Sequence, residues 1–176
     1  MSELLLIWVG RRAPAPIEAL ADDYKRRLAR HLDLAEVRIK PADGRADARR
    51  ALAEEASAIR RHLAATDVVV ALDEGAHERS TEEFARWLGR RSRLARTALV
   101  IGSDLGLDAE FKRQASELLA LSRMTLSHQL ARVLLLEQLY RACDWIAGGA
   151  YHRGRVGWED APIGMRSRKK PDREKR

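Results

Sequence analysis

The stretch LSRMTLSHQLARVLLLEQLYRACDWIAGGAYHR, residues 121–153, decides how this chain folds. It begins with a short apolar segment, turns at Ser127 and His128, and continues as a long helix up to the glycine pair at 148–149. A helix with so many apolar residues must bury one side. The rest of the chain therefore has to provide a core for it.

The two sides of this helix carry different residues. Its apolar face consists of Leu135, Leu136, Leu139, Cys143 and Ile146, and its polar arc of Glu137, Tyr140, Arg141 and Asp144. His128 and Arg132 lie one turn apart near the N-terminus, where backbone amides and the helix dipole favour an anion. Glu137 and Arg141 of the polar arc could belong to a functional site, but a solvent-exposed ion pair between them explains their spacing equally well.

Upstream of this stretch, apolar runs alternate with amphipathic segments. The pattern predicts strands at residues 4–9, 34–40, 68–72, 98–101 and 118–121. It predicts helices at residues 17–30 and 46–64, after Ser80 or Thr81, and from near Asp108. Because parallel strands need crossover connections, this order indicates an α/β fold with a mostly parallel sheet of five to six strands flanked by helices. The alternating residues 34–40 indicate a strand near the sheet edge.

In such a sheet, ligands bind beyond the carboxyl ends of the strands. The loops there are residues 72–75, 102–107 and 121–126, and they are rich in glycine and small residues. Exposed backbone groups in loops of this kind suit a neutral purine and a ribose, although ordinary turns explain the glycines equally well. The chain has no GxGxxG, GxxxxGK[ST], GxSxG or HExxH motif, which excludes the common dinucleotide, P-loop, hydrolase and zinc-protease signatures.

Composition narrows the class of protein further. The 176 residues carry a formal net charge of +7, and residues 154–176 alone carry eight basic and four acidic side chains, which favours a polyanionic partner. The single cysteine, Cys143, excludes a disulfide framework, and no metal-binding spacing is present. The first apolar run, residues 4–9, is too short for a signal peptide or a membrane span, so we expect a cytoplasmic protein with no membrane partner.

Four motifs give the chain a family resemblance. They are VALDEG at 70–75, LVIGSDLGL at 99–107, LSRMTLSHQLARVLLLEQLYRA at 121–142, and YHR at 151–153. With these motifs the chain resembles the ribosomal RNA large subunit methyltransferase H family, of the SPOUT class, over residues 1–153. It departs from the family pattern at Ser103, where a second glycine is usual, and at Ser127, where a proline usually precedes the histidine.

The resemblance implies a SPOUT-type α/β knot, in which the C-terminal segment is threaded into a trefoil. It also implies a homodimer that binds S-adenosylmethionine in the knot and methylates N3 of a pseudouridine in helix 69 of 23S ribosomal RNA, on the ribosome. The apolar face of the helix from His128 is then the expected dimer contact. Residues 1–153 form the expected methyltransferase domain. Residues 154–176 depart from the family, which normally ends near YHR, and their composition predicts a flexible basic extension that contacts RNA or, alternatively, obstructs the site.

The resemblance also implies roles for individual residues. The expected cofactor-binding residues are Leu72, Asp73, Gly102, Ser103, Gly106, Leu121, Ser122, Arg123, Met124, Thr125 and Leu126. The candidate catalytic residues are Glu137, His152 and Tyr140, with Glu137 the first choice to accept or orient a proton. The expected RNA-binding residues are His128, Arg132, Arg141, Tyr151 and Arg153, and no residue is expected to bind metal.

Two other interpretations remain open on the sequence. In the first, the chain is a ribosome-binding SPOUT homologue whose cofactor site is weakened or lost, since Ser103 and Ser127 depart from the pattern. In the second, it is a SPOUT enzyme with a different RNA target. Binding of S-adenosylmethionine separates an enzyme from a binding protein.

Overall fold

The computed structural model describes residues 3–45, 47–91 and 95–151. Strands and helices alternate through this part of the chain, as the sequence predicts. The elements are β1 (Glu3–Val9), α1 (Ala15–Leu28), β2 (Asp33–Ile39), α2 (Ala48–Arg60), β3 (Val68–Leu72), α3 (Thr81–Arg91), β4 (Thr97–Ile101), α4 (Ala109–Gln114), β5 (Glu117–Leu119) and α5 (His128–Ile146).

The five strands of the described residues form one parallel sheet in the order β2-β1-β4-β3-β5. The α/β class is therefore confirmed, and so is the position of β2 at an edge. The inner strands β1 and β4 are buried along almost their whole length, which is why they read as uninterrupted apolar runs.

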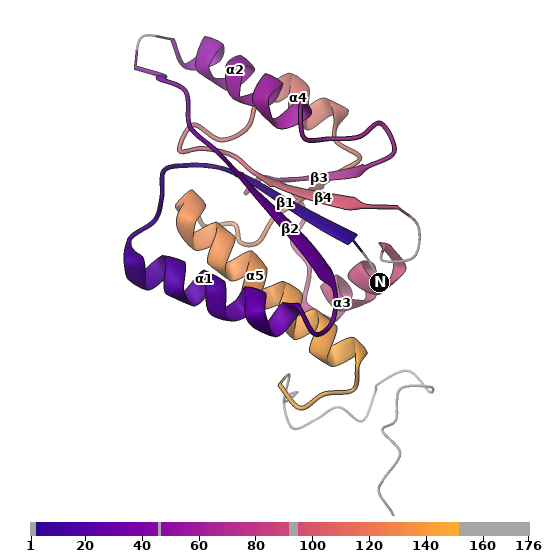
Figure 1. The fold of residues 1–176 in the computed structure, drawn as a ribbon. Coiled ribbons are helices and arrows are strands. Elements are labelled where there is room, and N and C mark those ends of the chain that lie inside the picture. Colours follow the sequence, from indigo (N-terminus) through magenta and orange to yellow (C-terminus); the bar gives the residue numbers. More distant parts are fainter. Residues whose placement is uncertain (1–2, 46, 92–94, 152–176) are drawn as a thin grey trace, which may run out of the picture.

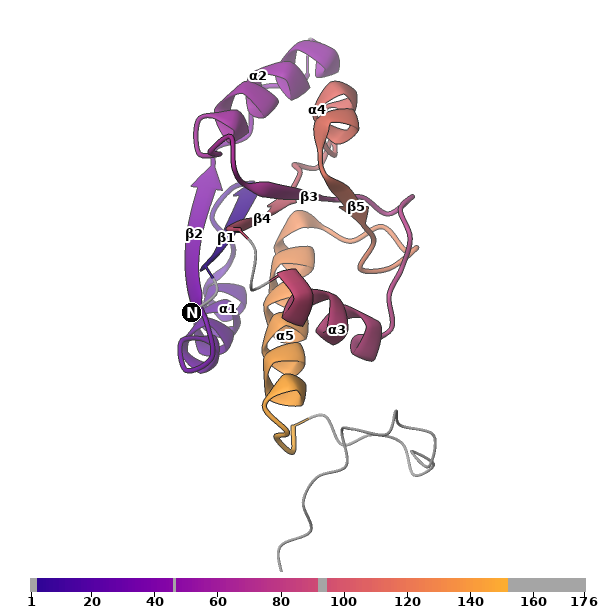
Figure 2. The same ribbon diagram turned by 90° about the vertical axis from the view of Figure 1, so that its right-hand side faces the viewer.

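The helices cover both faces of the sheet. Figure 1 shows α2 and α4 on one face, and α1, α5 and α3 on the other. In the perpendicular view of Figure 2, α5 runs between α1 and α3. The long helix is thus the central element of its layer.

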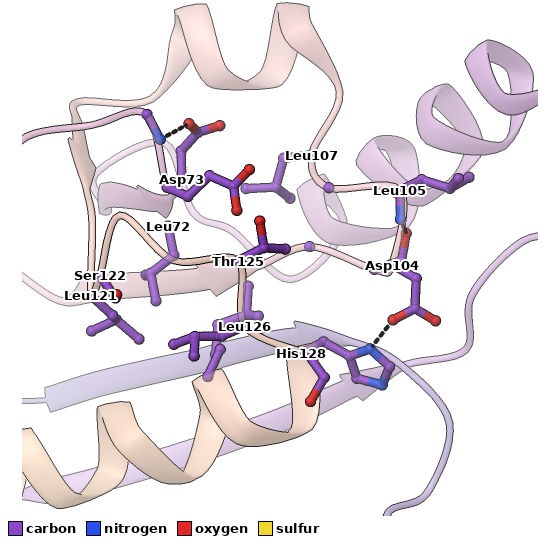
Figure 3. Close-up of a pocket in the computed structure, with 18 of the residues that line it drawn as sticks. Leu72, Asp73, Asp104, Leu105, Leu107, Leu121, Ser122, Thr125, Leu126 and His128 are labelled. Atoms are coloured by element: carbon purple, nitrogen blue, oxygen red, sulfur yellow. Dashed lines mark hydrogen bonds and ion pairs between the residues drawn. The ribbon is translucent and has the colours of Figure 1, made fainter.

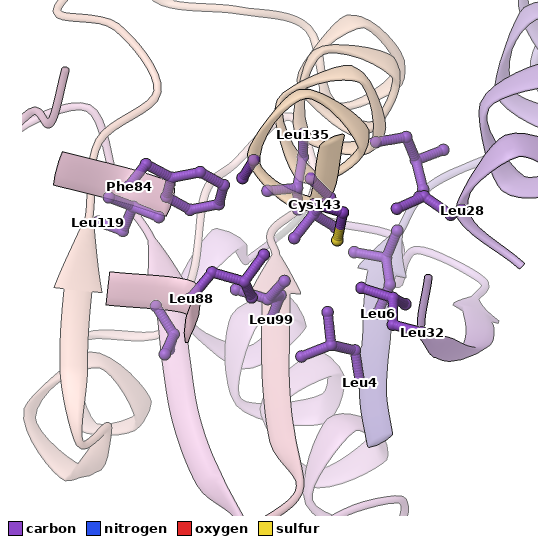
Figure 4. Packing of buried hydrophobic residues seen from close by; sticks show 14 of the residues in the cluster. Leu4, Leu6, Leu28, Leu32, Phe84, Leu88, Leu99, Leu119, Leu135 and Cys143 are labelled. Carbon is purple, nitrogen blue, oxygen red and sulfur yellow. The ribbon is translucent and has the colours of Figure 1, made fainter. Parts of the chain in front are cut away.

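The apolar face of α5 forms the core of the single chain. Leu135, Leu136 and Leu139 are fully buried, and α5 side chains face β1, β4 and the neighbouring helices in Figure 4. The prediction that this face is the dimer contact is therefore wrong. A periodic apolar pattern reports that a face is buried, but it does not say what covers it.

The start of α5 is fixed by a helix cap. The Ser127 side chain accepts a hydrogen bond from the backbone N–H of Leu130 at 3.3 Å, which satisfies one of the free amides of the first turn. The serine at the usual proline position therefore has a structural role.

The strand order and helix layers agree with the SPOUT-type α/β fold. The trefoil knot itself stays a prediction. No helix among the described residues is long and apolar enough to cross a membrane.

Candidate cofactor pocket and tyrosine cluster

A pocket of about 590 Å³ lies at the carboxyl ends of β3 and β4, beside the start of α5. The predicted loops 72–75, 102–107 and 121–126 all contribute to its lining. Figure 3 shows Leu72, Leu107, Thr125 and Leu126 arranged around it. Parallel strands bring these loops together because their carboxyl ends meet at one edge of the sheet.

Nearly all the predicted cofactor-binding residues line this pocket. They are Leu72, Asp73, Gly102, Ser103, Gly106, Leu121, Ser122, Met124, Thr125 and Leu126. Arg123 is the exception, because its exposed side chain lies beside Glu78, whose carboxylate also accepts a hydrogen bond from the Arg123 backbone at 2.9 Å. Arg123 therefore helps to hold the loop in place and does not face the pocket.

Gly102 allows two parts of the β4 loop to approach closely. A Cβ atom at this position would lie 2.3 Å from the carbonyl oxygen of Gly106, which is too close for any side chain. Gly106 has a positive φ of 83°, a conformation that favours glycine. The two glycines make a tight loop whose backbone lines the pocket.

The Ser103 hydroxyl is engaged by α2. It donates a hydrogen bond to Oε2 of the buried Glu55 at 2.8 Å. The other carboxylate oxygen of Glu55 accepts from the backbone N–H of Ala42 at 3.0 Å. Ser103 thus ties the pocket loop to α2 and to the loop after β2.

The pocket is lined by more negative than positive charge. The carboxylates are Asp73, Glu74 and Asp104, and Lys112 is the only cation if His128 is neutral. Nζ of Lys112 lies 2.6 Å from Oδ2 of Asp73. This hydrogen bond lowers the pKa of Asp73, so the carboxylate is ionised at neutral pH.

His128 connects the start of α5 to the β4 loop. Its Nδ1 lies 2.8 Å from Oδ1 of Asp104, and its ring stacks on Trp8. Its Nε2 is buried without a partner, close to Gly10, where a Cβ atom would lie 2.5 Å away. His128 holds the β4 loop through Nδ1, and its predicted contact with RNA stays a prediction.

Arg132 is buried and departs from its predicted role. Its guanidinium donates to Glu18 at 2.9 Å and to Glu36 at 2.5 Å and 3.2 Å, and it lies over the Trp8 ring. The predicted contact with RNA phosphate is wrong, because 3% of this side chain is exposed and its donors are already occupied. Burial alone would raise the pKa of Glu36, but hydrogen bonds from Arg132 and Lys25 outweigh it and lower that pKa.

The far end of α5 carries a second group of side chains, which we call the tyrosine cluster: Tyr24, Glu137, Tyr140, Arg141 and Tyr151. The Tyr140 ring makes an edge contact with Tyr151, and Arg141 pairs with Glu137 while lying over the Tyr151 ring. The Tyr151 hydroxyl donates to Oε1 of Glu137 at 3.3 Å. The alternative of a simple surface ion pair is thus incomplete, because both partners of the pair also contact Tyr151.

The phenol of Tyr151 is held in its protonated form. A hydrogen bond with the Tyr24 hydroxyl, burial, and the charge of Glu137 raise the pKa of Tyr151 above its usual value. At neutral pH this side chain can donate a proton in a hydrogen bond, as it does to Glu137.

The structure does not bring the pocket and the tyrosine cluster together within one chain. The pocket lining ends at Ala131 of α5, whereas Glu137 lies roughly 13 Å and Tyr140 roughly 18 Å along the helix from His128. His152 and Arg153 lie outside the described residues. Glu137 and Tyr140 of one chain therefore lie away from a ligand in the pocket of the same chain.

Sequence reasoning missed several residues that shape these two regions. Tyr24, Glu18, Glu36, Glu55 and Lys112 were not among the candidate site residues. Partners of the last four lie between 39 and 114 residues away in the chain. No local pattern could have indicated those pairs.

Comparisons with known proteins agree with this geometry. A parallel α/β sheet with a ligand pocket at its carboxyl edge is an arrangement shared by many α/β enzymes. The family model described as "Predicted SPOUT methyltransferase" matches residues 2–152. Within that class, the chain belongs to the ribosomal RNA large subunit methyltransferase H family.

Two curated relatives carry the name ribosomal RNA large subunit methyltransferase H. The protein of Thiobacillus denitrificans is 44% identical over 154 residues, covering 86% of this chain and 99% of the relative. That of Dechloromonas aromatica is 40% identical over 153 residues, covering 86% and 98%. A solved structure of a probable methylase family protein from Haemophilus influenzae Rd KW20 shares the fold, with a TM-score of 0.53, 17% identity, and coverage of 88% of this chain and 72% of that one.

The described residues hold no group of three or more His, Cys, Asp or Glu side chains placed to bind a metal ion. Burial raises the pKa of the Cys143 thiol to about 11, so this buried cysteine is a neutral core residue at physiological pH.

Proposed function

We propose that this chain transfers a methyl group from S-adenosylmethionine to large-subunit ribosomal RNA. The finer proposal is methylation at N3 of a pseudouridine in helix 69 of 23S rRNA, on the ribosome and in the cytoplasm. Membership of a methyltransferase family and the names of the relatives support this proposal. The observation that carries it is the negatively charged, glycine-built pocket at the carboxyl edge of the sheet.

The pocket fits the proposed cofactor in charge and in backbone shape. S-Adenosylmethionine carries a sulfonium and an ammonium group against one carboxylate, so an excess of carboxylates attracts it. The same excess would repel a nucleoside triphosphate. Gly102 and Gly106 leave backbone groups accessible to a purine and a ribose, and Ser103 directs its hydroxyl to Glu55 on α2. These features support an intact cofactor site over a weakened one.

The cofactor supplies an electrophilic methyl carbon on a positively charged sulfur. N3 of the pseudouridine would take this methyl group as the carbon–sulfur bond breaks and S-adenosylhomocysteine leaves. The N3 proton would go to the Glu137 carboxylate, our first candidate acceptor, or to His152, the second. Tyr140 and Tyr151 pack beside Glu137 and orient it or the target base. Alignment of the reacting atoms can lower the activation free energy by about 7–11 kcal/mol, so positioning supplies much of the rate enhancement.

The separation of the pocket from the tyrosine cluster leads us to propose a homodimer with shared sites. Glu137 lies roughly 13 Å from the pocket end of its own helix, so the tyrosine cluster of one copy serves the pocket of the other. Leu130, in the first turn of α5, is about half exposed, and a second copy would cover it. Arg141, Tyr151 and Arg153 would then contact RNA near the second copy's pocket, and residues 154–176 would extend that contact.

Methylation of defined ribosomes tests the proposed function. We expect the purified protein to transfer a labelled methyl group from S-adenosylmethionine to ribosomes from cells that lack it. Mass spectrometry of the rRNA should place one methyl on a helix 69 pseudouridine. A methyl elsewhere in the rRNA would support the different-target interpretation. Ribosome binding without cofactor binding would support the inactive homologue.

A further inference from the structure

A second hollow of about 930 Å³ adjoins the cofactor pocket. It is formed by the loop after β1, the loop after β2 and the first turn of α5, and it shares residues 103–105 and His128 with the pocket. The backbone N–H of Gly10 donates to the carbonyl of Ile39 at 2.9 Å, which holds the two loops side by side. A molecule lying in this hollow therefore reaches the edge of the cofactor pocket.

The carboxylates around the hollow are already occupied. Glu55 accepts hydrogen bonds from Ser103 and Ala42, and it is buried. Both carboxylate oxygens of Asp43 accept from Arg45. Asp104, the third, bonds to His128, as described above.

The remaining basic side chains are available to an outside ligand. Arg11 and Lys40 are exposed and form no hydrogen bond or ion pair with another described residue. Arg12, the next residue after Arg11, lies outside the hollow lining and is also exposed. The hollow thus presents two exposed cations, Arg11 and Lys40, beside the cofactor pocket, and these cations favour a ligand with anionic groups.

We propose that this hollow holds the phosphate backbone of the substrate RNA strand, with Arg11 and Lys40 on the phosphates next to the target nucleotide. The inference rests on the proposed function. A strand in the hollow would present one base to the shared wall at residues 103–105, which is where the methyl donor's pocket begins. Arg132, the cation predicted for this role on α5, is buried and paired, so the role falls to these loops.

A matched pair of double variants tests the proposal. The first is Arg11→Ala with Lys40→Ala. The control is Arg30→Ala with Arg61→Ala, which removes the same charge from exposed positions at the ends of α1 and α2, outside the hollow. We measure KM for ribosomes, kcat, the salt dependence of kcat/KM, and the Kd for S-adenosylmethionine.

The first variant should raise KM for ribosomes at least about tenfold, because two charge-assisted contacts are lost. The slope of log(kcat/KM) against log salt should become shallower by about 1.4, since each phosphate contact on a single strand contributes about 0.7. The Kd for S-adenosylmethionine should not change, and the control should match the wild type.

Three outcomes would overturn the inference: an unchanged KM, an equal rise in the control, or a rise in KM with an unchanged salt slope. The last would indicate a ribosomal protein contact instead of a phosphate contact. Wild-type protein is measured first. If it methylates no rRNA, the proposed function itself fails, and that failure is separate from the comparison of variants.

Discussion

The two ends of α5 are held by different kinds of contact. At its N-terminal end, Ser127 caps the helix, His128 bonds to the β4 loop, and Arg132 bonds two carboxylates. At the other end, the contacts are tyrosine ring packing and the pair between Glu137 and Arg141. Hydrogen bonds with fixed directions thus hold the end of α5 beside the cofactor pocket, whereas tyrosine rings in edge and tilted contacts lie around the candidate catalytic group.

This difference indicates how one helix can serve two sites. The pocket end is completed by the chain's own loops, so a single copy can prepare the cofactor site. The tyrosine cluster lies at the other end of α5, away from the cofactor pocket of its own chain, and in the proposed dimer it would act on the pocket of the second copy. Each prediction below perturbs one end and measures whether the other end responds.

The largest effect should follow from Arg132→Met at the pocket end. The variant leaves Glu18 and Glu36 without their buried partner, which costs about 3–5 kcal/mol of unfolding free energy. Urea denaturation at pH 7 measures this loss. Arg123→Met, at an exposed position on the pocket loop, is the matched control and should cost little.

The stability lost in Arg132→Met should depend on pH in a defined direction. The pKa values of Glu18 and Glu36 lie below 4.5 in the folded chain, because hydrogen bonds from Arg132 outweigh the opposing effect of burial. Their contribution to stability is therefore present above the unfolded pKa and is lost as pH falls through the folded values. The stability gap between wild type and Arg132→Met should shrink from pH 7 to pH 3. A gap that stays constant would contradict the ion-pair account.

The next largest effect should follow from Glu137→Gln at the tyrosine end. If this carboxylate accepts the proton, kcat should fall by at least about 100-fold while the Kd for S-adenosylmethionine stays unchanged. Single-turnover methylation of ribosomes and calorimetric titration provide the two values. Full activity at saturating ribosome concentration would remove the assignment and leave His152 as the candidate.

Gly102→Ala should weaken cofactor binding without affecting the tyrosine cluster. The added Cβ would lie 2.3 Å from the Gly106 carbonyl and force the loop apart. A cost of about 1–3 kcal/mol corresponds to a Kd roughly 5 to 150 times higher. Gly89→Ala in α3 is the control, since its Cβ would make ordinary contacts at 3.5 Å or more. Equal affinities for the two variants would contradict the role of the close approach.

The smallest effect should come from Ser103→Ala. The substitution removes the hydrogen bond to the buried Glu55 and should raise the Kd for S-adenosylmethionine about three- to tenfold, for roughly 1 kcal/mol. Ser103→Thr, which keeps the hydroxyl, should restore most of the affinity. If the alanine variant binds more tightly than the wild type, the serine obstructs the cofactor instead of ordering the loop.

The sequence was sufficient for the fold and for the location of the pocket. The buried strands read as apolar runs, and their carboxyl ends must meet at one sheet edge, so loops 72–75, 102–107 and 121–126 could be named in advance. Residues 128–147 could be recognised as a helix from their periodicity, and the observed α5 differs by one residue at its end.

The sequence was not sufficient for the contacts around α5. Arg132 reads as a phosphate ligand at a helix start, and only the fold shows that Glu18 and Glu36 approach it from α1 and β2. The apolar face reads as an interface, yet the chain's own sheet covers it. The sequence placed Glu137 correctly on a polar arc. Its separation from the pocket could not be predicted, because it depends on how α5 lies beside the β4 loop.

A mixing experiment tests the shared-site account most directly. Gly102→Ala has a damaged pocket, and Glu137→Gln has a damaged tyrosine cluster, so each protein alone should have little activity. When equal amounts are mixed and subunits exchange, half of the dimers are mixed, and each has one intact site. The account predicts recovery of about a quarter of wild-type activity. No recovery, with both variants folded and mixed dimers demonstrated by mass spectrometry, would show that pocket and tyrosine cluster do not act between copies.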